Sequence, residues 1–402
     1  MKRIIIIALL GIIALTSCNT IKTISTLKKG EVEQQKFAVN IPFEYRLGLI
    51  VFDVTIDGQE YSFILDTGAP NVISKKLAEK LDLTSTSYQD VGDSQGEVSK
   101  LGFTSIEKIS IGVINFLNTG AAIADLSISR EVACLNVDGF IGANLMKNAI
   151  WKFDYDKQII TISNSTESLN IPEQNEKVPF FTKMTGTPIL DITLNSVTEK
   201  NVILDLGSNG DIALSKKTLD KIMKTEAKLP LSVSFGNSSS GLYGTGASDS
   251  IYYTSVSDVS FGDIALKNTI VEFTNESAST IGTNFFKNYD LVINWFDKEI
   301  TLMKNKEYDN SSLSSYGFSY NNHNDSLIVS RIHNNSSAAN EGLKINDIIL
   351  EINGEEYGEL TSDQWCSIVE NGLFHDENSS ITVVVLRDNE ELTFNLAKST
   401  LL

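Results

Sequence analysis

The chain has 402 residues, of which 42% are hydrophobic and 21% charged. It is therefore long enough for two or three folded domains, and its composition is that of an ordinary globular protein. The formal net charge of −18 argues against a nucleic-acid partner, because phosphate binding requires a basic surface.

The N-terminal stretch MKRIIIIALLGIIALTSCNT contains two basic residues, a short apolar run and a cysteine. The run, residues 4–15, is too short to span a bilayer as a mature helix. Its end resembles the bacterial lipoprotein box, in which the cysteine is lipidated and becomes the new N-terminus. The resemblance implies a signal peptide at 1–17, a lipid anchor on Cys18 and a polar tether over 18–39. Asn19 after the cysteine favours the outer membrane of a bacterial cell envelope; the alternative is a plain secretory signal with an incidental cysteine.

Two long segments of the chain repeat each other in order. Residues 52–81 align with 190–222: in each, an alternating strand leads to an apolar strand that ends in Asp-x-Gly, and a short helix beginning Ser-Lys-Lys follows. Residues 138–163 match 279–303, each with an apolar-apolar-Gly turn, a short helix and a hairpin. Between them lie short strands with Gly, Asn and Ser turns, which is an all-β pattern. We therefore expect two homologous β lobes: lobe 1 at 40–175 and lobe 2 at 176–305.

The C-terminal part, residues 306–402, follows a polar linker and has a different pattern of short strands and two helices. It resembles a bacterial PDZ domain, a small α+β fold, with Tyr316, Gly317 and Phe318 at the position of the family's carboxylate-binding loop. The resemblance implies that backbone N–H groups capture peptide C-termini, which add as a strand. The alternative is a PDZ fold that packs on the lobes without binding peptide.

Several kinds of catalytic chemistry are excluded by what the lobes lack. Histidine occurs only at His323, His333 and His375, all in the C-terminal domain, so the lobes cannot use a Ser-His-Asp or Cys-His mechanism. There is no HExxH zinc motif and no Walker A sequence. We expect neither a metal nor a cofactor.

Two cysteines follow Cys18, namely Cys134 and Cys366. Both lie in apolar surroundings, EVACLNV and DQWCSIV. We expect buried structural thiols, with no disulfide framework, although an oxidising compartment would permit a disulfide.

The lobes do share an aspartate at the end of an apolar strand, Asp66 in SFILDTGAPNVIS and Asp205 in NVILDLGSNGDIALS. Two carboxylates brought together cannot both ionise cheaply, so the pair holds one proton over a wide pH range. The ionised member can act as general base on a water while the protonated one hydrogen-bonds a substrate carbonyl. Gly68 and Gly207 permit the sharp turns and the close approach of the two loops. The sequence therefore predicts a catalytic dyad.

These motifs resemble the pepsin and retropepsin family of aspartic peptidases. Asp66-Thr67-Gly68-Ala69 has the retroviral form in full, and FIGANLM and TIGTNFF are similar to the family's turn and helix. The resemblance implies a mainly β fold in which two retropepsin-like lobes form one pepsin-like bilobal unit. It also implies an endopeptidase acting on peptides or unfolded proteins, monomeric because one chain supplies both lobes.

Lobe 2 departs from the family at Leu206, where the family has threonine. In the family the two threonines hydrogen-bond across the lobes, so Thr67 loses its symmetric partner. Ser208 is the pepsin-type residue that would bond the outer carboxylate oxygen of Asp205, which supports a functional aspartate there. The alternative function is an inactive peptide-binding or scaffolding lipoprotein.

The sequence YGTG, residues 243–246, matches the flap that pepsins lay over the active site, but it occurs in lobe 2. Tyr243 is therefore a possible flap residue, and an ordinary glycine hairpin is the alternative. Lobe 1 has residues 92–103 at the corresponding place, without a tyrosine.

Overall fold

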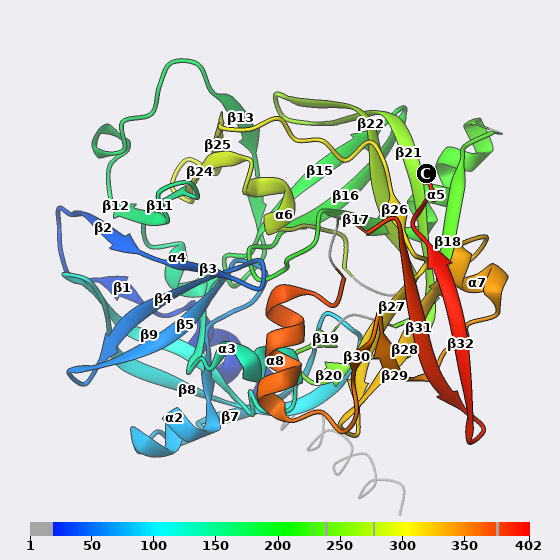
Figure 1. Cartoon of the computed structure of the whole chain (residues 1–402). Coiled ribbons are helices and arrows are strands. Elements are labelled where there is room, and N and C mark those ends of the chain that lie inside the picture. Colours follow the sequence, from blue (N-terminus) through cyan, green and yellow to red (C-terminus); the bar gives the residue numbers. More distant parts are fainter. Residues whose placement is uncertain (1–18, 227, 238–239, 276–277, 375–377) are drawn as a thin grey trace, which may run out of the picture.

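The computed structural model describes residues 19–402 except 227, 238–239, 276–277 and 375–377 (Figure 1). The predicted signal peptide and the predicted lipid site Cys18 lie outside the described residues. The described chain is mainly β, as the sequence predicts. None of its helices, within those ranges, is long and apolar enough to cross a bilayer.

Lobe 1 is built on a sheet with strand order β1-β9-β6-β10-β5-β4-β8-β7. At its centre β5 (Gln59–Asp66) runs parallel to β10 (Gly139–Gly142), with Gly142 opposite Asp66. The other strands are β1 (Glu31–Val32), β2 (Ala38–Pro42), β3 (Glu44–Arg46), β4 (Leu49–Ile56), β6 (Val72–Ser74), β7 (Ser87–Gly92), β8 (Val98–Ile111), β9 (Ile114–Ala124), β11 (Ile150–Asp154) and β12 (Ile159–Ser163). The helices are α2 (Lys75–Lys80), α3 (Arg130–Leu135), α4 (Ala143–Met146) and the 3-10 turn η1 (Thr166–Ser168).

The strands of lobe 2 are ordered β14-β15-β16-β23-β17-β22-β21-β18. Read in reverse, the part β22-β17-β23-β16-β15 repeats the order β9-β6-β10-β5-β4 of lobe 1. Its central strand β16 (Val197–Leu204) again has a parallel neighbour, β23 (Thr280–Ile281). The other strands are β13 (Glu176–Pro179), β14 (Phe181–Thr182), β15 (Pro188–Leu194), β17 (Ile212–Ser215), β18 (Leu231–Gly236), β19 (Ser240–Gly241), β20 (Gly244–Thr245), β21 (Asp249–Phe261), β22 (Ile264–Thr274), β24 (Tyr289–Asn294) and β25 (Glu299–Lys304). The helices are α5 (Lys216–Thr225) and α6 (Thr283–Phe286).

The repeated Ser-Lys-Lys motif starts a helix in each lobe, as the sequence predicts. Helix α2 begins at Lys75, directly after Ser74, whose hydroxyl accepts a hydrogen bond from the Leu77 N–H at 3.0 Å. Such a cap satisfies one of the free N–H groups of the first turn. Helix α5 begins at Lys216 after Ser215.

The two lobes share a six-stranded sheet of order β13-β25-β24-β11-β12-β2. Its middle pair joins β11 of lobe 1 to β24 of lobe 2, with Trp151 opposite Ile293. Both residues belong to one apolar cluster that draws side chains from both lobes. The lobes are therefore held together by continuous backbone pairing and by a common core.

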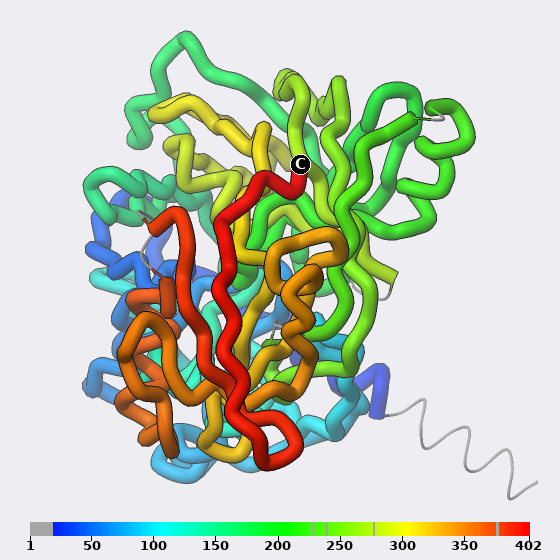
Figure 2. The backbone as a smooth tube through the Cα atoms, turned by 45° about the vertical axis from the view of Figure 1, so that its right-hand side comes forward, coloured from blue at the N-terminus to red at the C-terminus, as the bar shows by residue number. Residues whose placement is uncertain are grey.

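The C-terminal domain lies against both lobes (Figures 1 and 2). Its strand β28 (Ser326–His333) pairs with β18 of lobe 2, with Ile332 opposite Phe235, so that the lobe-2 sheet continues into this domain. Its other elements are β26 (Ser314–Ser315), β27 (Phe318–His323), β29 (Ile348–Ile352), β30 (Glu355–Glu356), β31 (Ser380–Arg387), β32 (Glu390–Ala397), β33 (Ser399–Thr400), α7 (Ser337–Glu341) and α8 (Ser362–Asn371).

The segment predicted as a free polar tether packs on lobe 1, so that prediction is wrong for residues 19–39. Residues 19–28 are helical, and Leu27 is buried. The hydroxyls of Thr23 and Ser87 lie 2.8 Å apart, and β1 pairs with β9. Thr23 and Leu27 lie one helical turn apart, so they form one buried stripe on this helix.

Cys134 and Cys366 form a disulfide, so the prediction of separate buried thiols is wrong. They are 232 residues apart in sequence, and the fold brings α3 of lobe 1 beside α8 of the C-terminal domain. Both cysteines are partly exposed. The bond attaches the C-terminal domain covalently to lobe 1.

Candidate active site

The two aspartates predicted as a dyad face each other between the lobes. Asp66 ends β5, and Asp205 directly follows β16. A Cβ atom added to Gly68 would lie 2.7 Å from Cγ of Asp205, and one added to Gly207 would lie 2.5 Å from Cγ of Asp66. Each carboxyl group therefore rests against the glycine of the other lobe, and a side chain larger than hydrogen would separate them.

Backbone N–H groups hold each carboxyl group in place. The Oδ1 atom of Asp66 accepts hydrogen bonds from Gly68 at 2.8 Å and Ala69 at 2.9 Å. The Oδ1 atom of Asp205 accepts one from Gly207 at 2.9 Å. These bonds form because each aspartate loop turns sharply at Asp-x-Gly, which brings its own N–H groups back to the carboxylate.

Burial and, to a lesser degree, the charge of Asp205 raise the pKa of Asp66 to about 8. The hydrogen bonds from Ala69 and Gly68 act in the opposite direction and lower this pKa. Burial also raises the pKa of Asp205, but the hydrogen bonds from Gly207 and Asp66 oppose that rise. Two carboxyl groups this close cannot both ionise cheaply, so the upward direction of both pKa shifts favours a pair that keeps a proton.

Thr67 connects the two aspartate loops. Its buried hydroxyl donates to the Leu204 carbonyl at 2.6 Å and accepts from the Leu206 N–H at 2.8 Å. The Leu206 side chain is fully buried in the common core. Thr67 therefore ties the lobe-1 loop to the lobe-2 loop by hydrogen bonds, while Leu206 contributes apolar packing in the place where the family has a second threonine.

Ser208 does not take the place that the resemblance implies. Its hydroxyl accepts from the Gly210 N–H at 3.3 Å, and within the described residues no hydrogen bond joins it to the Asp205 carboxylate. The Ser208 carbonyl instead accepts from the Thr283 N–H at 2.8 Å and hydroxyl at 3.0 Å. Ser208 therefore ties the aspartate loop to the start of α6.

In each lobe two further side chains stabilise the aspartate loop by hydrogen bonds, and they were not predicted from the sequence. In lobe 1 the Asn144 amide oxygen accepts from the Asn71 N–H at 2.7 Å, and the Asn71 amide oxygen accepts from the Gly142 N–H at 2.6 Å. In lobe 2 Asn284 donates to Asp211 in the same place. The signal was present in the repeat, because GANL and GTNF carry Asn144 and Asn284 at equal positions.

The hairpin tips of the two lobes meet. The Tyr243 N–H of lobe 2 donates to Oδ2 of Asp93 at 3.0 Å, and Asp93 follows β7 of lobe 1. The Tyr243 ring packs with Leu242 against an apolar cluster of lobe 1, where burial and then the charge of Asp93 raise the Tyr243 pKa. The structure thus places YGTG at a hairpin tip that contacts lobe 1; its catalytic role stays a prediction. Asp93 lies in the segment 92–103 that the sequence places at the corresponding position of lobe 1, but its contact with Tyr243 was not predicted.

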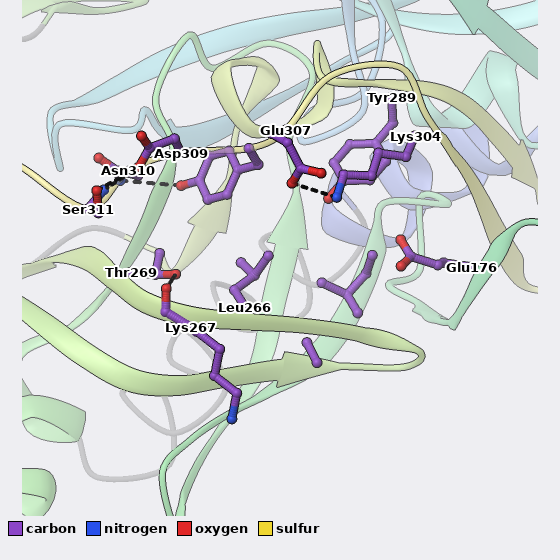
Figure 3. A pocket seen from close by; sticks show the side chains of 13 residues that line it. Glu176, Leu266, Lys267, Thr269, Tyr289, Lys304, Glu307, Asp309, Asn310 and Ser311 are labelled. Carbon is purple, nitrogen blue, oxygen red and sulfur yellow. Dashed lines mark hydrogen bonds and ion pairs between the residues drawn. The ribbon is translucent and has the colours of Figure 1, made fainter.

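A hollow of about 180 Å³ lies in lobe 2 between β22 and the linker that follows β25. Figure 3 shows the side chains that line it. It is lined by polar groups that bond one another: Asn310 donates to the Tyr308 hydroxyl at 3.2 Å, and Lys304 pairs with Glu307 at 2.6 Å. None of the lining residues belongs to the aspartate loops. Across the described ranges, no group of three or more His, Cys, Asp or Glu could hold a metal ion.

The loop predicted to bind carboxylates lies at the start of β27. Tyr316 and Phe318 are buried, and Gly317 has φ +98°, a conformation that favours glycine. The Gly317 N–H donates to the Ser315 hydroxyl at 3.0 Å. The structure thus places the loop directly before β27, and carboxylate binding there stays a prediction.

Comparison with known families locates two domains in the chain. The model of the aspartyl protease family matches residues 52–145, a range that contains Asp66. The PDZ domain model matches residues 314–397, which contain Tyr316 and Gly317. No curated protein matches the chain.

Proposed function

We propose that this chain, which contains an aspartyl protease domain and a PDZ domain, is an aspartic endopeptidase whose two lobes form one pepsin-like unit. The observation that carries the proposal is the carboxyl pair, in which each member rests against the glycine of the opposite loop. The repeated strand order supports lobe 2 as the second half of the site, with Asp205 as the partner of Asp66.

The proposed reaction adds water to a peptide carbonyl between the two aspartates. Asp205 as carboxylate removes a proton from water while Asp66 as acid donates its proton to the carbonyl oxygen, and a tetrahedral diol forms. In the second step Asp66 takes back a proton from the diol and Asp205 delivers its proton to the amide nitrogen. The C–N bond then breaks, and the dyad regains its starting protonation.

The surrounding residues position the two aspartates and the substrate, and they take no part in the proton transfers. Thr67 fixes the distance between the loops through the Leu204 carbonyl and the Leu206 N–H. We propose that the Tyr243 and Asp93 hairpin tips cover the bound peptide together and part for its entry. The expected substrates are peptides or unfolded proteins, as the resemblance to aspartic peptidases implies.

The disulfide supports a location outside the reducing cytoplasm, since such bonds persist in oxidising compartments. We propose that Cys18 carries a lipid that holds the mature, monomeric chain at the bacterial outer membrane. Feeding cells a fatty-acid probe tests this: Cys18→Ser should give an unlabelled, released protein. Unchanged labelling would refute the anchor.

The function is tested by incubating the chain with a mixed peptide library from acid to neutral pH, with and without a statine inhibitor. Cleavage that the inhibitor suppresses is expected, because statine imitates the tetrahedral diol.

A second candidate, a peptide-binding lipoprotein without turnover, is favoured only by Leu206, which removes one of the two threonines of the family. Inhibitor binding without any cleavage would select this second function.

A further inference from the structure

The sheet of lobe 1 has two faces, and the face that carries Asp66 is apolar. Along β5 successive side chains point to opposite faces, so Ile64 lies on the same face as Asp66. Residues directly opposite each other on neighbouring strands also share a face. Ile64 lies opposite Val51 and Phe140. Phe140 in turn lies opposite Val72, and we call these four apolar residues the Asp66 face.

The Asp66 face is covered in this structure. Its four residues are at most 9% exposed, and they belong to an apolar cluster on which Leu242 and Tyr243 pack. These two residues form the tip of the β19–β20 hairpin of lobe 2, whereas the other described members of the cluster lie at 27–140. A peptide held between the two aspartates would place side chains on this face, because those of an extended chain alternate in direction. The hairpin tip and a bound peptide therefore compete for this cluster.

Asp93 of lobe 1 holds the tip of the hairpin by a hydrogen bond to a charged group. Its Oδ2 atom accepts from the Tyr243 N–H at 3.0 Å. Its Oδ1 atom accepts from the N–H groups of Gln95 at 2.9 Å and Glu97 at 3.1 Å. A Cβ atom added to Gly241 would lie 2.2 Å from Oδ2, so the hairpin lies directly on the carboxylate. One oxygen of Asp93 thus fixes its own turn, and the other fixes the hairpin.

Asn321 of the C-terminal domain holds the other strand of the hairpin. Its Nδ2 group donates to the Thr245 hydroxyl at 3.0 Å, and its Oδ1 atom accepts from the Asn322 N–H at 2.8 Å, which fixes the orientation of the amide. Asn321 is buried on β27, whose neighbour β28 pairs with β18 just before the hairpin. The hairpin therefore lies between lobe 1 and the C-terminal domain (Figure 1). At its base Asn237 donates to the Ala247 carbonyl at 3.2 Å, a bond within lobe 2 that opening need not break.

We propose that the hairpin in this position blocks the site beside Asp66, and that Asp93 and Asn321 are positioning residues that hold it there. A peptide that enters displaces Leu242 and Tyr243 and breaks both bonds, and the hairpin then covers the peptide from further out. The C-terminal domain thereby contributes to how often the site is open. This inference rests on the proposed peptidase function and adds what controls access to the same site.

Both bonds stabilise only the empty, closed protein, so their loss should favour peptide binding. When the binding-competent state is a minor one, the apparent affinity is reduced by its fraction, and a change that raises this fraction lowers KM. A hydrogen bond to a charged group shifts an equilibrium by roughly ten- to a hundredfold, and a neutral one by roughly two- to tenfold. The rate of the chemical step should change little, because the dyad is untouched.

Asp93→Asn breaks the first bond with almost no change of shape. The carbonyl oxygen of the new side chain can keep the bonds from Gln95 and Glu97, while its NH2 group faces the Tyr243 N–H and cannot accept. We expect KM on a fluorogenic peptide to fall by at least about tenfold, with kcat within about twofold of the wild type. Asp90→Asn is the matched control, because it removes one charge from an exposed residue of β7. It should cleave as the wild type does.

The second bond is tested from both of its partners. Asn321→Ala and Thr245→Val should each lower KM by about two- to fivefold, and the double variant by no more than either alone, because both changes remove the same bond. Thr245→Ser keeps the hydroxyl and should behave as the wild type. Thr245 is exposed, so its substitution leaves the apolar core intact.

Hydrogen exchange of the segment 240–246, measured by mass spectrometry, reports the opening of the hairpin without any cleavage. Exchange should be faster in Asp93→Asn and Asn321→Ala than in the wild type and in Asp90→Asn. If no form of the chain cleaves, the peptidase function fails, and the affinity for a statine inhibitor takes the place of KM in this test.

A higher KM, or a lower kcat with an unchanged KM, in folded Asp93→Asn would overturn the proposal, because the hairpin would then be a productive cover. Faster exchange without a lower KM would also overturn it, since opening would not limit entry. Unchanged exchange and KM in both Asp93→Asn and Asn321→Ala would show that neither residue holds the hairpin, while cleavage by the wild type would leave the peptidase function standing.

Discussion

Thr67→Val tests whether one hydroxyl keeps the aspartate loops in register. Valine has nearly the shape of threonine, so the substitution leaves no cavity but removes the bonds to the Leu204 carbonyl and the Leu206 N–H. Each buried group without a partner costs about 1–3 kcal/mol. The free energy of unfolding should therefore fall by roughly 2–6 kcal/mol, the sum of two such costs.

The same change should slow catalysis, because a misplacement of about 1 Å can lose on the order of a hundredfold in rate. Thr67→Ser is the control, since it keeps the hydroxyl and loses one methyl group, worth about 1 kcal/mol. Urea unfolding and kcat on a fluorogenic peptide measure both effects. If Thr67→Val is as stable and as active as Thr67→Ser, the hydroxyl does not set the register and the reasoning is wrong.

Leu206→Thr should raise kcat more than it changes KM, because a second hydroxyl would tighten the loops; a slower variant would show that leucine is adapted to this interface. The raised pKa of Asp66, about 8, means that the folded chain keeps a proton that the unfolded chain releases above its ordinary carboxyl pKa. As the pH rises between the two pKa values, the free energy of unfolding should therefore fall by about 1.4 kcal/mol per pH unit. Urea titrations at pH 5 and 7 measure this slope, which Asp66→Asn should remove. Equal slopes in the wild type and in Asp66→Asn would contradict the shift. Arg331 is buried where the PDZ domain meets lobe 2, and its charge opposes the rise that burial causes in the pKa of Glu272. Arg331→Met should lower the melting temperature, because it should reduce the free energy of unfolding by about 3–5 kcal/mol. Adding Glu272→Gln should recover most of that stability. If it recovers none, Arg331 and Glu272 do not interact.

The parts of the site that could be predicted are those encoded in short repeated segments. Asp66 and Asp205 each end an apolar strand before glycine, so both their turns and their equivalence are visible in the sequence. The absence of a second threonine at Leu206 was also visible, because both loops are recognisable in the sequence. Local chemistry and the internal repeat were sufficient there.

The parts that escaped prediction depend on contacts between distant segments. Cys134 and Cys366 are 232 residues apart, and nothing near either cysteine indicates its partner. Asp93 meets Tyr243 only because two hairpins from different lobes converge. Thr23 and Leu27 belong to a stretch predicted as a tether, whose buried stripe becomes evident only against lobe 1.

Cleavage of a fluorogenic peptide by Asp66→Asn and Asp205→Asn tests the shared dyad most directly. The control is Asp82→Asn, an exposed lobe-1 position with φ +51°, which asparagine tolerates well. The account predicts that each dyad variant is folded and loses turnover, while Asp82→Asn cleaves as the wild type does. Turnover retained by either folded dyad variant would contradict a site built from both lobes.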